Sequence, residues 1–429
     1  MELCWVLGKA LEVLRRYPLC DRCLGRLFAQ LGKGFDNAER GRAIKTCLAM
    51  EIHQALSAGT VSVDDVKDVA KSCDEVRRVL ETLGISAEAG AGNCYICGNR
   101  LEHLIEWGVE AVKEKLCELG VDRFLVGVVP PSDIVEKEKE VARATGLTTW
   151  ESVRSELKRV IGKAVRDRYG FKPDFENPCV TIILDMNTMS VRVEVPSLLI
   201  LGTYWKLGRR ISQVPWIEKD GSRRYPLAIE DALQAAAEVA RGDKAVFHGG
   251  GREDVDVRML GSGRPFVLEI HRALDHSVDL RIVEEKINSF SPWLGFELEM
   301  SVRREVVANV KGSRGYKIYR ALVLTERSVS EEDLSMLESF FRGRVVEQWT
   351  PKRVLRRKRE ALRRRKVISV RAMRLDSNLF EALIKAEGGL YIKELISGDD
   401  GRTTPSFSEV LNTKAVCLEL DVVYVQKQI

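Results

Sequence analysis

The chain has 429 residues, of which 45% are hydrophobic and 31% charged, and its formal net charge is +5. This composition is ordinary for a folded protein with buried cores and argues against wholesale disorder, and the length suggests two to three domains. No apolar run approaches the roughly 18 residues of a membrane-spanning helix. The first five residues contain an early acid and no basic segment, so no secretory signal is expected. We therefore expect a cytoplasmic protein without membrane segments.

Residues 1–121 are expected to be helical. Apolar residues recur with the period of an amphipathic helix in three segments, namely 37–56, 62–83 and 103–119. The first β-rich run is 123–129, and two prolines directly after it end the strand, because proline cannot donate to a strand ladder.

Two C-x-x-C pairs interrupt this helical region, and each is followed closely by a glycine: Cys20 with Cys23, and Cys94 with Cys97. A tight turn presents two thiolates to one side of a Zn²⁺ ion, and four thiolates complete a closed tetrahedral site, which is structural. The alternative is a redox dithiol in one pair and packing in the other, because roughly seventy residues separate the pairs, more than in short zinc modules. A chain without an export signal favours the metal over disulfides. The other six cysteines are expected to lie in the core.

Residues 122–220 are expected to form a small α+β unit. A helix is expected over 150–168. The β-branched run 180–186, an Asn-Thr turn signal and the run 190–195 together predict a hairpin. A further strand is expected over 198–201.

Residues 221–429 begin with a predicted helix over 229–239 and continue as short strands and helices. Regular βαβ alternation is absent, so a doubly wound dinucleotide-binding fold is disfavoured. The predicted strands are 266–271, 295–302, 316–324, 345–350, 368–375 and 415–425.

A glycine-rich acidic string over residues 248–261 is the least ordinary stretch of this region. Three glycines precede Arg252, and five charged side chains then stand within seven positions, interleaved with valines. If a loop enters a strand here, Asp254 and Asp256 share one face and Arg252 is able to pair with either. On chemistry alone, a surface turn with salt bridges is an equal alternative.

The positive charge is concentrated in one segment. Residues 352–366 hold ten basic residues and a single acid, Glu360. A dense cationic element on a near-neutral body indicates a local contact with a polyanion, and arginine suits phosphate because it binds in a bidentate way. The alternative is a solvated helical face.

Gly251-Arg252-Glu253-Asp254 resembles the Gly-Arg-x-Asp motif of pseudouridine synthases. The longer string through residues 263–270 resembles the THUMP-containing tRNA pseudouridine synthases of archaea and eukaryotes called the Pus-ten family. Blocks that resemble this family follow one another in order along nearly the whole chain, at residues 20–26, 202–206, 210–213, 348–355 and 391–395. Residues 271–274, Arg356 and Leu390 depart from the usual family sequence, which affects loop geometry and substrate positioning only.

The resemblance implies a catalytic role for three residues. Asp254 would be the catalytic aspartate, acting as a nucleophile or as a base at the sugar, and it must be ionised for either task. Lys393 would be the neighbouring cation that keeps it ionised. Tyr319 would stack on the flipped base, close to its C5 proton. Further substrate contacts are implied for Tyr391, Arg252 and either Leu418 or Leu420.

The resemblance also implies an α+β architecture and a substrate. A helical region with a four-cysteine zinc site (1–121) and a THUMP-like RNA-binding unit (122–220) would precede a pseudouridine synthase catalytic domain (221–429) with a mixed, largely antiparallel sheet. The family acts on uridines 54 and 55 in the T-loop of tRNA, which requires the base to be flipped out. A monomer would bind the T-arm and acceptor stem, with a structural Zn²⁺ and no cofactor for catalysis. RNA contacts are expected from Arg353, Arg356, Arg357, Arg363, Arg364, Lys206 and Arg210.

Two other functions fit parts of the pattern. One is a catalytically silent, zinc-containing tRNA-binding protein on the same scaffold. The other is a different THUMP enzyme, a methyltransferase or thiouridine synthase, but the sequence shows neither a glycine-rich S-adenosylmethionine loop nor an ATP-binding P-loop. We therefore expect an isomerase that makes pseudouridine in tRNA.

Overall fold

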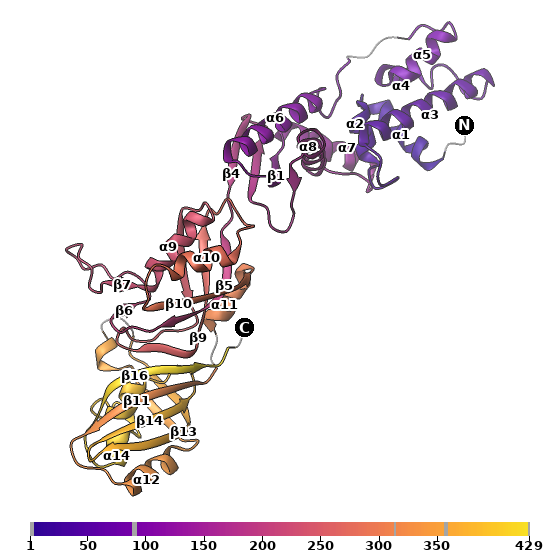
Figure 1. Cartoon of the computed structure of the whole chain (residues 1–429). Coiled ribbons are helices and arrows are strands. Elements are labelled where there is room, and N and C mark those ends of the chain that lie inside the picture. Colours follow the sequence, from indigo (N-terminus) through magenta and orange to yellow (C-terminus); the bar gives the residue numbers. More distant parts are fainter. Residues whose placement is uncertain (1–3, 88–91, 313–314, 356–358, 428–429) are drawn as a thin grey trace. The chain divides into compact units, whose positions relative to one another are not determined.

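The computed structural model describes residues 4–87, 92–312, 315–355 and 359–427. The chain divides into two compact units, Met1–Val195 and Pro196–Ile429 (Figure 1). Each unit combines helices with a sheet, so the predicted α+β class is confirmed. None of the helices in the described ranges has the length and hydropathy of a membrane span.

The boundary between the units lies earlier than the sequence analysis placed it. β5 (Leu198–Lys206) belongs to the segment that we assigned to the middle region, but it pairs with β9 (Arg258–His271) and β10 (Leu294–Ser301). All three are strands of the large sheet of the second unit. The expected boundary at residue 221 therefore moves to residue 196, because the backbone hydrogen bonds of β5 are made with the second unit.

In the described part of the first unit, six helices precede the first strand. Asp36 directly precedes α3 and caps it, because its carboxylate accepts a hydrogen bond from the Ala38 N–H at 2.7 Å. The single helix predicted over 62–83 is two short helices, because Cys73 between them has an extended backbone. The six are α1 (Trp5–Arg16), α2 (Asp21–Leu27), α3 (Asn37–Ser57), α4 (Lys67–Ser72), α5 (Asp74–Thr82) and α6 (Leu101–Leu119).

The small sheet of the first unit has the strand order β2-β1-β3-β4. β1 runs parallel to β2 and β3, and β3 and β4 form the predicted antiparallel hairpin. Two helices connect β1 to the rest of the sheet. The bounds are β1 (Arg123–Val129), α7 (Ser132–Thr145), α8 (Val153–Tyr169), β2 (Lys172–Pro173), β3 (Val180–Asp185) and β4 (Ser190–Glu194).

The second unit is built on a ten-stranded sheet with the order β10-β5-β9-β16-β11-β14-β13-β12-β15, and β8 also pairs with β9. Among the described strands, β9 and β16 are the one parallel pair of this sheet. The predicted mixed, largely antiparallel sheet is therefore confirmed, and Figure 1 shows β16, β11, β14 and β13 side by side. The further bounds are β8 (Lys244–Gly249), β11 (Lys317–Thr325), β12 (Val345–Trp349), β13 (Leu362–Asp376), β14 (Leu379–Ala386), β15 (Thr403–Thr404) and β16 (Ala415–Val425).

Alternate residues of β11 face the core of the second unit. Tyr319, Ala321 and Val323 are buried, and they stand opposite Ile384, Ala382 and Phe380 of β14, which are also buried. The period of two thus fixes Tyr319 on the inner face of the sheet. The remaining elements of this unit are β6 (Ile211–Ser212), β7 (Leu227–Ala228), α9 (Ile229–Val239), α10 (Leu280–Asn288), α11 (Arg304–Gly312), α12 (Glu331–Phe341), a 3₁₀ turn (Lys352–Val354), α13 (Ile392–Ser397) and α14 (Phe407–Val410).

Candidate active site and metal centre

A loop between β8 and β9 carries the acidic string. The Lys206 ammonium donates to three backbone carbonyls: that of Asp254 at 3.0 Å, that of Val255 at 3.3 Å and that of Ile211 at 3.1 Å. Lys206 is only 1% exposed, and burial lowers the pKa of its ammonium. It therefore holds the loop in place. The prediction that Lys206 binds RNA is wrong, because a phosphate cannot reach this buried group.

Successive side chains of the loop point in opposite directions. The carboxylate of Glu253 is buried, where it accepts a hydrogen bond from the Tyr204 hydroxyl at 2.9 Å and lies 3.1 Å from Nε of the buried Arg264. The Asp254 side chain is 35% exposed. Gly251 has a φ of 96°, and a Cβ there would lie 2.9 Å from Nη1 of Arg264, so the loop needs glycine at this position. Glu253 thus anchors the loop and Asp254 is left to face the cavity.

Asp254 lines a cavity of about 350 Å³ in the second unit. Tyr319, Tyr391, Lys393 and Arg252 line the same cavity, so the structure brings these four together with Asp254, as the family resemblance implied. Leu420 is also in its wall, whereas Leu418 is not and is 51% exposed. The choice between these two leucines, which the sequence left open, therefore falls on Leu420.

Two cations lie beside the Asp254 carboxylate. Nη1 of Arg353 is 2.9 Å from Oδ2 of Asp254, and Nζ of Lys393 is 3.8 Å from the same oxygen. Lys393 makes its shorter contacts with both oxygens of Asp256, at 2.6 and 2.8 Å. Among the described residues, the cation in closest contact with Asp254 is thus Arg353, which we had assigned to RNA binding.

Two tyrosines give the cavity aromatic surface. Burial raises the pKa of Tyr319 to about 12, so its phenol stays protonated near neutral pH. The guanidinium carbon of Arg363 lies 5.3 Å from the ring centroid of Tyr391, and that of Arg353 lies 6.0 Å from it. These are cation–π distances, which fix the ring and hold positive charge at the cavity.

The other residues predicted to contact RNA differ in exposure and in the groups they contact. Arg364 is exposed on β13 and pairs with Glu347 at 2.9 Å, and Arg210 is exposed with a φ of 63°. Arg363 lies over Tyr391. Arg356 and Arg357 lie outside the described residues. The basic segment is therefore a 3₁₀ turn and the start of a strand in its described parts.

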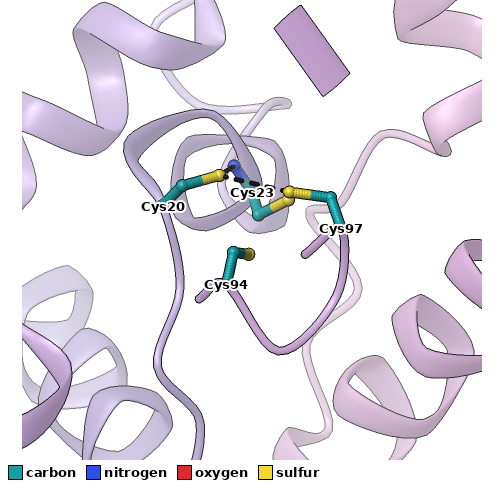
Figure 2. A group of neighbouring side chains, drawn as sticks. All are labelled: Cys20, Cys23, Cys94 and Cys97. Atoms are coloured by element: carbon teal, nitrogen blue, oxygen red, sulfur yellow. Dashed lines mark hydrogen bonds between the residues drawn. The ribbon is translucent and has the colours of Figure 1, made fainter. Parts of the chain in front are cut away.

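The four predicted metal ligands meet in the first unit. Cys20 precedes α2 and Cys23 is in its first turn, whereas Cys94 and Cys97 come from a separate turn before α6. Figure 2 shows the four thiols turned toward one another. All four sulfur atoms lie within 4.8 Å of one another. Of the other six cysteines, the structure buries Cys73 and Cys179 but exposes Cys4, Cys47 and Cys117, so our expectation of core positions was wrong for these three.

The geometry of the cluster fits a tetrahedral metal site. Zinc–sulfur bonds of about 2.3 Å place sulfur atoms roughly 3.8 Å apart in a tetrahedron. Sγ of Cys20 and Sγ of Cys97 are 3.7 Å apart. Gly98 has a φ of 58°, which allows the chain to turn directly after the second pair. Four cysteine ligands leave no open position, so such an ion would be structural.

One arginine connects this cluster to the small sheet's helices. Arg26 is 2% exposed, and its guanidinium contacts Sγ of Cys23 at 3.7 Å, Glu138 of α7 at 2.8 Å and Glu156 of α8 at 3.2 Å. Burial raises the pKa of both glutamates, so the arginine is needed to offset the cost of burying them.

Replacement of Arg26 by methionine is expected to destabilise the first unit strongly. The change leaves two buried carboxylates without their shared cation, which costs about 3–5 kcal/mol. For a unit of this size we expect the melting temperature to fall by roughly 10 °C, measured by calorimetry. Arg26→Lys keeps the charge and should lose less. An unchanged melting temperature in Arg26→Met would show that Arg26 does not stabilise the two buried glutamates.

The sequence did not predict the roles of three polar residues at the site, although it had singled out Asp256 as a neighbour of Asp254. Glu394 is buried in α13 and binds Arg353, Asp256 binds Lys393, and Gln213 donates to Tyr204, to Glu253 and to the Gly251 carbonyl. The signal for Glu394 was an acid within an otherwise apolar run next to Lys393. Gln213 belongs to a block that we quoted for the family resemblance, without a role.

Two family models match the chain. The one described as "Pus10, C-terminal" matches residues 199–426, and the one described as "Pus10 THUMP domain, archaeal" matches residues 108–185. The first match begins close to the boundary of the second unit at residue 196, and the second match lies within the first unit.

Curated relatives are similar over their full length. A "tRNA pseudouridine synthase Pus10" of Ignisphaera aggregans is 46% identical over 99% of this chain and 100% of its own. Proteins of the same name from Aeropyrum pernix and Methanocaldococcus jannaschii are 42% and 38% identical, over 99% and 96% of this chain and 98% and 92% of their own. These matches define the class of the protein, an isomerase that makes pseudouridine in tRNA. The chain belongs to the Pus10 family of tRNA pseudouridine synthases.

Proposed function

We propose that this tRNA pseudouridine synthase acts on uridines 54 and 55 of the T-loop, with Asp254 as its catalytic aspartate. The observation that carries the proposal is the cavity in the second unit, where Asp254 stands among two tyrosines and two cations. Its volume of about 350 Å³ is within the range of roughly 300–1,000 Å³ that is typical of ligand pockets.

The reaction is an isomerisation. The bond between C1′ and N1 of the uridine breaks, a new bond forms between C1′ and C5, the C5 proton leaves, and N1 gains a proton. A carboxylate at Asp254 can promote it as a nucleophile at the sugar or as a base, and both tasks need a position beside the flipped nucleoside.

The remaining lining groups suit a flipped uridine. Tyr319 offers an aromatic face to the base, and its protonated phenol offers a hydrogen-bond donor. Leu420 and Val422 supply apolar contacts, and Tyr391 supplies a second ring. Arg252 is exposed at the rim of the site, where a backbone phosphate of the RNA can meet it.

We assign tRNA binding to both units. Arg363, Arg364 and Arg210 supply positive charge near the T-arm in this proposal, and the THUMP domain of the first unit binds the acceptor stem. The four-cysteine cluster binds one Zn²⁺, which stabilises the first unit and takes no part in the chemistry. The enzyme works as a monomer in the cytoplasm, where its tRNA substrate is found.

Mapping of pseudouridine in tRNA transcripts tests the proposal. We expect the protein to modify positions 54 and 55 of an unmodified transcript without any added cofactor, detected by carbodiimide treatment and primer extension. Transcripts with cytidine at position 54 or at position 55 should lose the corresponding signal and keep the other. Modification confined to uridines outside the T-loop would overturn the site assignment.

A further inference from the structure

Arg353 lies between two carboxylates in the second unit. Its Nη1 atom meets Oδ2 of Asp254 at 2.9 Å, while its Nε atom meets Oε1 of Glu394 at 2.5 Å and its Nη2 atom donates to Oε2 of Glu394 at 3.3 Å. The guanidinium therefore uses one edge for Glu394 in a bidentate pair and turns a different nitrogen toward Asp254. Bidentate binding fixes the plane of a guanidinium as well as its position.

Glu394 is an unusual residue for the place it occupies. It is 4% exposed, and it lies on α13 among Ile392, Leu395 and Ile396, all of which are buried. Among the described residues, Arg353 is the one cation within 4 Å of its carboxylate. A buried carboxylate is costly unless it is paired, so Arg353 stabilises Glu394. In return, Glu394 restricts the position of the Arg353 guanidinium.

The lysine next to Glu394 in the sequence is engaged elsewhere. Lys393 binds both oxygens of Asp256, and its distance of 3.8 Å from Asp254 is longer than that of Arg353. Lys393 thus cannot replace the direct contact that Arg353 makes. The orientation of the Asp254 carboxylate therefore depends on Arg353, and the orientation of the Arg353 guanidinium depends on Glu394.

We propose that Glu394 is a positioning residue for catalysis, which clamps Arg353 so that Arg353 orients the Asp254 carboxylate. The inference rests on the proposed catalytic role of Asp254 and extends it to two residues that need not touch the substrate. It differs from the assignment of Arg353 to RNA binding. The Arg353 side chain is 37% exposed, but its guanidinium is paired with two carboxylates, so its charge is already balanced within the site.

The test is a set of single-turnover measurements with enzyme in excess over tRNA. A displacement of about 1 Å of a reacting group costs as much as about 100-fold in rate. We expect Glu394→Gln, which keeps the shape and removes the charge, to lower the rate constant about 10-fold to 100-fold. The dissociation constant for tRNA and its salt dependence should not change. Lys414→Met is the matched control, because Lys414 lies in the same unit but pairs with Glu326, which is 68% exposed, and does not line the cavity, so its rate should equal that of the wild type.

Arg353 variants separate positioning from RNA binding. Arg353→Met should lower the rate about 100-fold with unchanged tRNA affinity, and Arg353→Lys should recover part of the rate. If Arg353 bound a phosphate instead, Arg353→Met would weaken binding and reduce the salt slope by about one unit while the rate constant stayed high. That outcome would overturn the inference.

If Arg353→Met folds poorly, a double variant still allows the rate to be measured. Arg353→Met strands a buried carboxylate, whereas Arg353→Met with Glu394→Gln removes the stranded charge and should melt at a higher temperature. If Glu394 acts through Arg353, the second change adds no further loss of rate, so the two losses are not additive. Additive losses, or a normal rate in Glu394→Gln, would show that Glu394 is merely structural.

The outcome is distinguishable from a failure of the proposed function. If the wild type modifies uridines elsewhere in tRNA, the T-loop assignment fails, while the rates of the Glu394 and Arg353 variants still test the clamp. If Asp254→Asn is fully active, the catalytic role of Asp254 is refuted. The positioning role of Glu394 and Arg353 is then refuted with it.

Discussion

Asp254→Asn is expected to abolish pseudouridine formation while tRNA binding persists. The substitution keeps the size of the side chain but removes the carboxylate, and an amide can serve neither as a nucleophile at the sugar nor as a base. We expect the rate to fall by about 10⁴-fold or more, as is usual when a group that does the chemistry is removed. The release of tritium from tRNA labelled at C5 of uridine measures the rate, and filter binding measures the affinity.

Asp256→Asn is the matched control for this variant. Asp256 lies in the same loop and is exposed, but its partner is Lys393 and it does not line the cavity. We expect a loss of rate far smaller than that of Asp254→Asn. Asp254→Asn should also keep its melting temperature, because Arg353 retains its bidentate partner Glu394. Product formation at the wild-type rate in Asp254→Asn would refute the catalytic assignment.

The sequence was sufficient to find the motif residues that line the cavity, because a motif residue is recognised by its type and its neighbours in the sequence. Asp254, Tyr319 and Lys393 come from three distant segments of the sequence. The family resemblance alone assigned them to one site, and the structure places all three around one cavity. The contacts between them could not be predicted in the same way. Whether Arg353 or Lys393 lies closer to Asp254 depends on distances of 2.9 and 3.8 Å, which follow from the packing of the whole sheet.

Charge patterns were a poorer guide than apolar patterns. Lys206 and Arg353 were assigned to RNA because they are basic residues in or near family blocks, but one is buried under the loop and the other pairs with two carboxylates. A count of charges cannot distinguish a cation that meets solvent from one that meets a buried acid. Burial and pairing are properties of the fold.

The helices also show how far a sequence pattern can predict the structure. α9 was predicted with its observed bounds, 229–239, because its apolar residues follow the helical period. α7 was not predicted, because Glu138 occupies one of its buried positions and interrupts the apolar stripe. That acid is tolerated only because Arg26, more than a hundred residues away in sequence, pairs with it. A pattern confined to one segment cannot contain this information.

Removal of the metal is expected to unfold the first unit and leave the second intact. In structural zinc sites the free energy of metal binding contributes about 10–16 kcal/mol to folding, which exceeds the stability of most domains. Cys97→Ser removes one of the four thiols whose sulfur atoms lie within 4.8 Å of one another. We expect it to abolish the stoichiometric zinc measured by mass spectrometry and the calorimetric transition of the first unit, while the transition of the second unit stays in place.

Cys47→Ser is the matched control, because Cys47 lies in the same unit but is exposed and outside the cluster. It should retain one zinc per chain and both transitions. The activity of Cys97→Ser should fall through a higher KM, since the cavity that we propose as the active site lies in the second unit and the THUMP domain in the first. Wild-type protein without bound metal but with a stable first unit would refute the zinc assignment. A fall in kcat alone would instead show that the first unit acts on the catalytic step and not on tRNA binding.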